Sequence, residues 1–267
     1  MNQLEAMRHA GNINQQAIEC GFEWAIPGRT LLEIDRFIEW RIRSGNCKPA
    51  FKNYQPPGAS SPFPATACIS PNDVVVHGIP GDYIIQPGDL LTIDVGTEYN
   101  GWFVDAARSR VIPGASTQLE IAKAQKAQYL IDATEAILNA QLAVVRDECT
   151  LLELATAAEL TAAQYGVIIL PQWGGHAIGN KIHMDPFIPN TIDRSKSKLQ
   201  QQLESNKFAR ITLYEGETIC LEPVVSFKSS AIMIDVDMWT VRKADGELTA
   251  HTERCLVVTK NGFEILS

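Results

Sequence analysis

Two aspartates stand at the ends of the stretch DVGTEYNGWFVD, residues 94–105. The stretch is predicted to form a tight β-hairpin, because turn-forming residues lie between two β-like runs. A four-residue loop over 98–101 would make Thr97 face Trp102 and Asp94 face Asp105, with both carboxylates on the same face of the hairpin. Two like charges so close are unfavourable unless a cation lies between them. The alternative is that one aspartate caps a turn and the other lies at a strand edge.

Three of the five histidines lie in segments punctuated by glycine or proline. His77 is in NDVVVHGIP, His176 in GGHAIG and His183 in KIHMDP. Glycines allow a close backbone approach, which suits His176 as a ligand better than as a packing residue. A single histidine is more often structural, but three in such segments favour a chemical role. His9 is expected on the exposed face of the first helix.

Two glutamates interrupt apolar runs. Glu222 lies in TICLEPVV, and Glu253 opens the run HTERCLVVT. A buried acid is costly unless it is paired or metal-bound. A solvated strand face is the alternative, and it suits Glu253 better than Glu222. Together with Asp94, Asp105 and His176, the glutamates give four carboxylates and one imidazole, a set that suits two Mn, Fe, Co or Zn ions bridged by a water molecule.

The elements that must position these residues follow from periodicity and from capping signals. The N-terminal stretch has helical apolar spacing at Leu4, Met7, Ala10, Ile13 and Ile18. Later helices have clear starts and ends. The signals are Thr30 and Gly45 for the second helix, Ser116 or Thr117 for a helix over 116–142, and Thr150 with Glu153, then Gly166, for the last.

Strand-like runs follow each pair of helices. They are ATACIS, DVVVHGIP, DLLTIDVG, GWFVDAARSRVI, VIIL, TICLEPVVSF and CLVVTKNGFEIL. This order predicts an α+β fold, in which two similar halves surround a shared antiparallel sheet with helices on its outer face. We expect one catalytic domain over 1–267, with halves of about 1–115 and 116–267. The polar segment 190–210 is expected to be a surface excursion that is partly helical.

Composition excludes several classes of protein. The chain has 267 residues and a formal charge of -8, which does not suit a nucleic-acid binder. No apolar run reaches the ~18 residues that a membrane span requires. Six scattered cysteines and an N-terminus that does not resemble a signal peptide indicate a reducing compartment, so we expect a cytoplasmic protein. A monomer is the default expectation.

The motifs NDVVVHGIP, the two-aspartate hairpin, GGHAIG with IHMDP, CLEP, MWTV and TERCLVVTKNGFEIL stand in the order seen in one family. The chain resembles the type I, bacterial-like methionine aminopeptidases of metallopeptidase family M24. The resemblance covers nearly the whole chain. It implies the pita-bread fold, a curved antiparallel sheet between two pseudo-symmetric halves. It also implies removal of the initiator methionine from nascent polypeptides whose second residue is small, and leaves open whether the enzyme docks at the ribosome.

The resemblance implies a role for each site residue. Asp94 would bind one of two divalent ions (Co, Mn, Fe or Zn) in bidentate fashion, Asp105 and Glu253 would bridge both, and His176 and Glu222 would bind the other. A hydroxide bridging the ions would attack the scissile carbonyl. The proton shuttle would be Glu222, while His183 would polarise the carbonyl and His77 would contact the substrate near the scissile nitrogen.

The resemblance also implies an apolar pocket for the methionine side chain, formed by residues that include Phe63, Cys68 and Trp239; simple core packing is the alternative for each. Some positions depart from the family pattern. They are Ala177, Asn180, Ile182, Val76, Gly96, the tyrosine-free stretch 57–60, and His251 and Arg254 beside Glu253. These departures spare the five ligands and bear on how strictly methionine is selected.

Two other functions fit parts of the sequence. An Xaa-Pro aminopeptidase or dipeptidase has the same fold, and Asp94-Val95-Gly96 has some of its character, although those enzymes usually carry an extra N-terminal domain. A non-catalytic binding protein of this fold is the other, but such proteins lose their metal ligands. Both are weaker than the methionine aminopeptidase interpretation.

Overall fold

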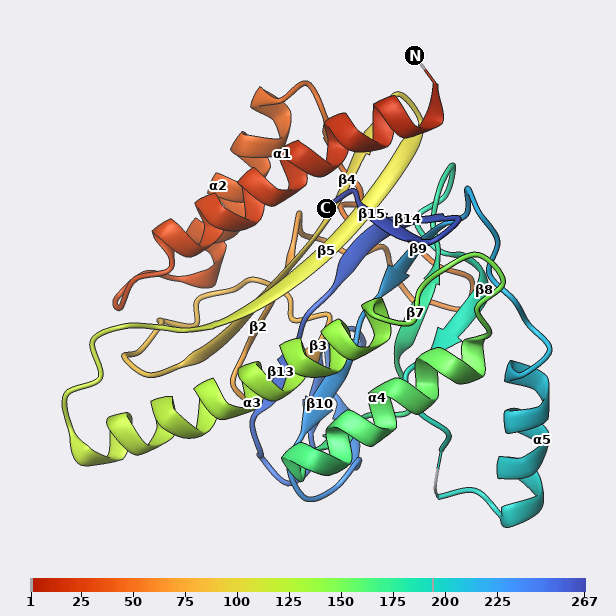
Figure 1. The fold of residues 1–267 in the computed structure, drawn as a ribbon. Coiled ribbons are helices and arrows are strands. Elements are labelled where there is room, and N and C mark those ends of the chain that lie inside the picture. Colours follow the sequence, from red (N-terminus) through yellow and green to blue (C-terminus); the bar gives the residue numbers. More distant parts are fainter. Residues whose placement is uncertain (1, 194) are drawn as a thin grey trace.

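The structure is a computed structural model that describes residues 2–193 and 195–267. Helices and strands alternate in groups, as predicted: two helices precede a first set of strands, and two more precede a second set (Figure 1). The helices are α1 (Gln3–Trp24), α2 (Leu31–Ser44), α3 (Gln118–Leu142), α4 (Leu151–Tyr165) and α5 (Lys198–Phe208). The strands are β1 (Lys48–Pro49), β2 (Cys68–Pro71), β3 (Val74–Val76), β4 (Leu90–Tyr99), β5 (Trp102–Val111), β6 (Ile168–Ile169), β7 (Gly174–Ala177), β8 (Met184–Pro189), β9 (Thr218–Leu221), β10 (Val224–Ser226), β11 (Ile232–Ile234), β12 (Val241–Lys243), β13 (Thr249–His251), β14 (Arg254–Thr259) and β15 (Gly262–Ile265).

The helix ends follow the capping signals. Thr30, Thr117 and Thr150 each accept a hydrogen bond from the backbone of a residue three positions later, and the side chain of that residue returns a bond to the cap. Such capping boxes satisfy amide groups that the first turn leaves unpaired. At the other end, Gly166 caps α4 in the left-handed conformation that glycine adopts at little cost. The predicted boundaries of α2 and α4 are therefore confirmed.

The strands form antiparallel ladders. One ladder joins β1, β4, β2 and β5, another runs in the order β15-β14-β9-β7-β8, and two three-stranded ladders complete the set. Hydrogen bonds across the middle connect them: the Glu253 amide donates to the Ala107 carbonyl over 2.9 Å, and the Ser109 hydroxyl donates to the His251 carbonyl over 2.8 Å. Strand β5 thus connects the ladder of the first half to that of the second.

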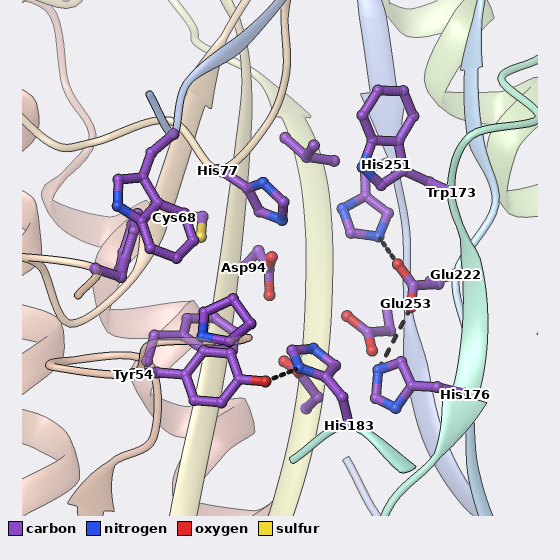
Figure 2. A pocket seen from close by; sticks show the side chains of 16 residues that line it. Tyr54, Cys68, His77, Asp94, Trp173, His176, His183, Glu222, His251 and Glu253 are labelled. Atoms are coloured by element: carbon purple, nitrogen blue, oxygen red, sulfur yellow. Dashed lines mark hydrogen bonds and ion pairs between the residues drawn. The ribbon is translucent and has the colours of Figure 1, made fainter. Parts of the chain in front are cut away.

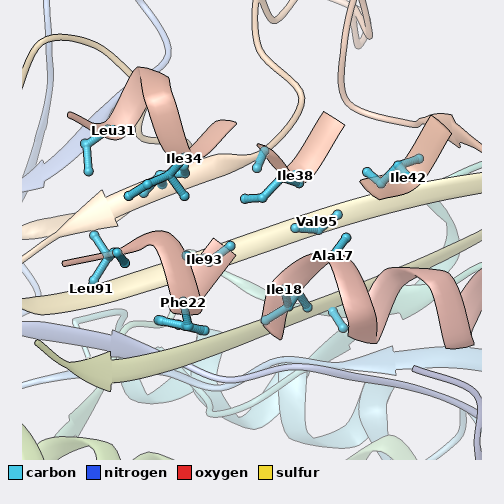
Figure 3. Close-up of a cluster of buried hydrophobic side chains, with 14 of the residues drawn as sticks. Ala17, Ile18, Phe22, Leu31, Ile34, Ile38, Ile42, Leu91, Ile93 and Val95 are labelled. Carbon is cyan, nitrogen blue, oxygen red and sulfur yellow. The ribbon is translucent and has the colours of Figure 1, made fainter. Parts of the chain in front are cut away.

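The helices cover these ladders in pairs. Helix α1 lies along β4 and β5, and α2 packs against α1 and β1, whereas α3 and α4 lie over β10, β13 and β6 (Figure 1). Under the first pair, Ile18 of α1 and Ile38 of α2 meet Ile93 of β4 in one buried cluster (Figure 3). A second cluster under α3 and α4 includes Leu130 and Val225. Because burial of apolar surface is the main stabilising term in folding, these two clusters hold the strands in place.

The loop predicted for the hairpin is wrong. Tyr99 pairs with Trp102, so the loop contains only Asn100 and Gly101, both with positive φ (52° and 81°). Asn-Gly favours this two-residue turn, whose twist matches that of the strands. As a result Asp94 pairs with Ala107 and Asp105 with Gly96. The two aspartates are diagonal neighbours on the same face, because shortening the loop by two residues preserves the side-chain alternation.

Three further expectations are corrected or refined. The run TICLEPVVSF is two strands, β9 and β10, separated by Glu222 and Pro223. His9 is half-buried rather than exposed, with its ring on Tyr99 and its Nε2 3.0 Å from the Gly45 carbonyl. The excursion 190–210 is partly helical, as expected, through α5; residue 194 lies outside the described residues. In the described part of the chain, no helix has the length and apolar character needed to cross a bilayer.

Candidate active site

A cavity of about 180 Å³ opens between the two halves, and all ten predicted site residues line it (Figure 2). Its lining divides into two surfaces. The ligand wall consists of Asp94, Asp105, His176, Glu222 and Glu253. The apolar wall consists of Phe51, Tyr54, Phe63 and Trp239. The other lining residues are Pro56, Cys68, Val76, His77, Trp173, His183 and His251.

Three carboxylates of the ligand wall converge. Asp94 lies on β4, Asp105 on β5 and Glu253 just before β14, and their ligand oxygens lie within 4.8 Å of one another. One oxygen of each, namely Oδ1 of Asp94, Oδ1 of Asp105 and Oε1 of Glu253, is buried without a hydrogen-bond partner among the described residues. Unsatisfied buried oxygens of this kind are expensive unless a cation binds them.

The electrostatics of these acids point in the same direction. Burial raises the pKa of Asp94 to about 7. Burial, and then the neighbouring charges of Glu253 and Asp94, raise the pKa of Asp105 well above its usual range. The pKa of Glu253 is likewise raised by burial and then by Glu222 and Asp94. The charges of Glu253 and Asp94 thus make Asp105 harder to ionise, and those of Glu222 and Asp94 do the same to Glu253, so a multivalent cation would relieve the repulsion.

His176 faces the carboxylates from β7. Its Nδ1 lies 3.0 Å from the Ala177 carbonyl, to which it can donate, so that Nε2 remains free to accept. Burial, followed by the proximity of His183, lowers the pKa of His176 to about 4, so the ring is neutral. The glycine before it is required by packing: a Cβ on Gly175 would lie 2.0 Å from the Cys220 carbonyl oxygen of β9.

Glu222 lies between two imidazoles. Its Oε1 is 3.5 Å from Nε2 of His176, and its Oε2 is 3.6 Å from Nε2 of His251 (Figure 2). It occupies the break between β9 and β10, where Pro223 ends the ladder. Burial, then the charges of Asp105 and Asp94, raise the pKa of Glu222 well above its usual range. A carboxyl group with a raised pKa in a cleft is suited to proton transfer.

Two more histidines project into the cavity. His77 has a φ of 56°, in the left-handed region that non-glycine residues rarely adopt, and strained residues of this kind cluster at functional sites. Its ring stands edge-on to Trp239. His183 lies at the exposed mouth, where its Nδ1 is hydrogen-bonded to the Tyr54 hydroxyl over 3.0 Å (Figure 2). That bond orients the ring and leaves Nε2 available.

The apolar wall is aromatic. Phe63 meets Trp239 edge-to-face with ring centroids 5.3 Å apart, and Phe51 meets Phe63 at 6.5 Å. Cys68 of β2 lies beside them, fully buried, and burial together with the nearby acids raises the pKa of its thiol. An enclosed aromatic surface of this size suits a flexible apolar side chain such as a thioether.

Sequence reasoning missed Phe51, Tyr54, Trp173 and His251 as lining residues. Tyr54 could have been found: the resemblance predicts a tyrosine within 57–60, and Tyr54 lies three residues before that stretch. The departures from the family pattern at Gly96 and Ile182 are coupled by packing. A Cβ on Gly96 would lie 2.7 Å from Phe51 and 2.8 Å from Ile182, so glycine there makes room for both side chains.

The residues present fit a centre for divalent metal ions. The ligand wall offers oxygen and imidazole donors, which suit Mn, Fe, Co and Zn, and its unpartnered buried oxygens need a positive charge. An imidazole and four carboxylates around a small cavity can also transfer protons to and from a substrate held against the apolar wall.

Comparison with known proteins agrees with this geometry. The model of metallopeptidase family M24 matches residues 5–260. A methionine aminopeptidase of Mycoplasma capricolum subsp. capricolum is 32% identical over 266 residues, which cover 99% of this chain and 95% of that protein. The crystal structure of a methionine aminopeptidase from Thermotoga maritima has a TM-score of 0.84 at 26% identity and covers 99% of this chain and 96% of that one.

A prolidase structure from Pyrococcus horikoshii OT3 shows a likeness of fold alone. It has a TM-score of 0.69 at 18% identity, and this chain covers 61% of it. The predicted α+β pita-bread fold is therefore confirmed, as is the use of divalent metal ions as cofactor. From the family match over nearly its whole length, the chain belongs to metallopeptidase family M24.

Proposed function

We propose that this protein is a methionine aminopeptidase, which removes the N-terminal methionine from polypeptides whose second residue is small. The observation that carries the proposal is the meeting of the ligand wall and the apolar wall in one small cavity of a family M24 chain. The two sets of residues come from both halves of a single catalytic domain, 1–115 and 116–267. A substrate side chain held by one wall would present its peptide bond to the other.

The ligand wall would hold two divalent ions, with Asp94, Asp105, His176, Glu222 and Glu253 as ligands. When bound, such ions polarise a carbonyl and make water acidic enough to act as a nucleophile at neutral pH. Glu222, between its two imidazoles, would accept the proton of the attacking water and deliver it to the leaving amine.

The remaining histidines would act on the substrate directly. His183, with Nδ1 held by Tyr54, would direct Nε2 toward the scissile carbonyl and donate to the charge that develops on its oxygen. His77, held against Trp239, would contact the substrate near the scissile nitrogen. Burial and the proximity of His183 lower the pKa of His77 to about 4, so its ring would act as a neutral hydrogen-bonding group.

Selectivity would come from the apolar wall with Cys68. Phe63, Trp239 and Cys68 would enclose the methionine side chain at the apolar end of the cavity. Phe51 and Tyr54 extend the same surface. A larger N-terminal residue would have to displace one of these rings, which is costly in a packed wall.

The test is release of free methionine from a Met-Ala-Ser peptide by protein that was stripped with chelator and resupplied with Mn or Co. Met-Pro and Ala-Pro peptides run alongside. Cleavage of Met-Ala-Ser that depends on added metal would establish the activity. Cleavage of Ala-Pro alone would assign the Xaa-Pro function, and a protein that binds metal but cleaves none of the peptides would be a binding protein.

The finer parts of the proposal concern place and assembly. The enzyme would act in the cytoplasm, as a monomer, on nascent chains that leave the ribosome. Free cysteines throughout the described chain suit a reducing compartment. Cosedimentation with ribosomes that carry nascent chains, and the mass in solution by light scattering, test these two points.

A further inference from the structure

His251 is a buried histidine that the five predicted ligands do not include. The residue is 3% exposed, and its Nε2 has no hydrogen-bond partner within the described part of the chain. A buried polar atom without a partner destabilises a protein. An apolar side chain of the same size would fill this space without leaving a buried nitrogen unpaired. Packing alone therefore does not explain a histidine at this position.

The backbone of His251 is fixed from two sides. It pairs with Val224 of β10, two residues beyond Glu222. On the other side, Ser109 of β5 holds both backbone groups of His251. The His251 amide donates to the Ser109 hydroxyl over 3.1 Å, and that hydroxyl donates to the His251 carbonyl over 2.8 Å. The position of the ring is therefore set by two strands, and it is directed into the cavity (Figure 2).

The ring reaches Glu222 from the side opposite His176. Nε2 of His251 lies 3.6 Å from Oε2 of Glu222, and Nε2 of His176 lies 3.5 Å from Oε1. At 3.6 Å the contact is slightly longer than a direct hydrogen bond. Hydrogen bonds in active sites are often long before loading and shorten once the site is filled.

We propose that His251 is a positioning residue of the metal centre, which holds Oε2 of Glu222 by an N–H bond and thereby keeps Oε1 turned toward His176. The residue acts through Glu222 and does not itself bind the substrate. Groups that orient a metal-binding carboxylate typically change metal affinity by 10- to 100-fold. The inference rests on the metal centre of the proposed function, and its test is made on metal binding alone.

The experiment measures Mn²⁺ or Co²⁺ affinity by titration calorimetry on chelator-stripped full-length protein, together with the visible spectrum of the Co²⁺ form. His251→Leu keeps the volume but removes the N–H donor, and is expected to weaken binding 10- to 100-fold and to change the Co²⁺ spectrum. His251→Gln keeps an N–H donor and is expected to recover most of the affinity. His9→Ala, a histidine on α1 that contacts Gly45 instead, is the control and should bind as the wild type does.

Several results would overturn the inference. One is equal affinity and an unchanged spectrum in His251→Leu, and another is an equal loss in the leucine and glutamine variants, which would indicate packing rather than a hydrogen bond. If His251→Leu does not fold, His251→Asn, whose shorter amide cannot reach Glu222, replaces it in the comparison. If the wild type itself bound neither ion, the proposed function would fail first, and that outcome is distinct from the others.

Discussion

The two walls of the cavity are built in different ways. The ligand wall stands on strands or directly beside them: β4, β5 and β7 carry three of its residues, and the ends of β9 and β14 carry the glutamates. The apolar wall stands on irregular segments, with Phe51, Tyr54 and Phe63 between β1 and β2 and Trp239 between β11 and β12. Ladder geometry fixes the first wall, whereas loops can be altered with less effect on the rest of the fold. Chemistry and selectivity are thus carried by parts of different rigidity.

The largest effect is expected from a glycine in the strands of the ligand wall. In Gly175→Ala, the new Cβ would lie 2.0 Å from the Cys220 carbonyl oxygen, a backbone atom that cannot move without separating β7 from β9. We expect the free energy of unfolding to fall by about 3 kcal/mol or more. Urea unfolding followed by circular dichroism measures the change.

The matched control lies in the loop that carries the apolar wall. Gly58→Ala meets nothing within 4 Å, and its φ of 90° is the only source of strain. A loss of about 1 kcal/mol is expected there. If the two variants were equally unstable, the contrast in rigidity between the walls would be wrong.

The next largest effect is a loss of activity with no loss of stability. Asp105→Asn removes a charge from a buried cluster whose carboxylates repel one another. We expect methionine release to fall on the order of 10³-fold, as when a key electrostatic group is removed. In chelator, the melting temperature should stay the same or rise, because folding of the variant no longer buries a carboxyl group that is ionised in the unfolded chain.

Added Mn²⁺ distinguishes this variant from the wild type. It should raise the melting temperature of the wild-type protein, since the ion binds only the folded state, and should not raise that of Asp105→Asn. A drop in the stability of the variant in chelator would show that Asp105 has a structural role instead.

A pH effect tests how firmly the loop of the apolar wall is held where it enters β2. Asp35 of α2 accepts hydrogen bonds from the backbone amides of Thr66 and Ala67, beside Phe63, and burial raises its pKa to about 6. Because this pKa lies above that of the unfolded chain, about 3.9, Asp35 adds stability that is complete below about pH 4 and is lost as the pH rises to 6. The difference amounts to about 2–3 kcal/mol.

Unfolding of the wild type and of Asp35→Asn in chelator, between pH 4 and 7, measures this contribution. As the pH falls from 6 to 4, the wild type should gain stability relative to the variant, and above pH 6 the difference should be constant. Parallel curves over the whole range would mean that Asp35 ionises normally in the folded protein.

The smallest effect is expected in the apolar wall itself. Trp239→Ala opens the pocket, so kcat/KM for a Met-Ala-Ser peptide should fall about tenfold, mostly through KM, because the lost contact holds the ground state and the transition state alike. Stability should change little. Trp40→Ala, at an exposed site on α2, should leave both unchanged. A large loss of stability in Trp239→Ala would show that the apolar wall supports the fold as much as the ligand wall does.

Much of this arrangement could be read from the sequence, for local reasons. Thr30, Thr117 and Thr150 predict helix starts because a capping box needs only residues three apart. Asp94 and Asp105 could be placed on one face although the loop was wrong, because side-chain alternation survives a shift of two residues. The five ligands could be grouped from residue type and context, whereas their roles and the pocket residues came from motif order, which records the site without its geometry.

The remainder depends on contacts between distant segments. His251 looked like an ordinary neighbour of Glu253, and its orientation into the cavity depends on Ser109, more than a hundred residues away. The break at Pro223 was hidden inside a continuous apolar run. Tyr54 contacts His183 across a chain separation of 129 residues, which no local pattern indicates.

Two of the five tryptophans, Trp173 and Trp239, line the cavity. Their indole rings therefore form a built-in optical probe, because the emission of an indole responds to the polarity and the quenchers around it. Filling of the cavity by a paramagnetic ion or by a peptide can be followed by native fluorescence, without a label. The variants Trp173→Phe and Trp239→Phe, each of which removes one of the two cavity indoles, would separate the signal of the two sides, so that metal loading and peptide entry can be timed independently by stopped-flow fluorescence.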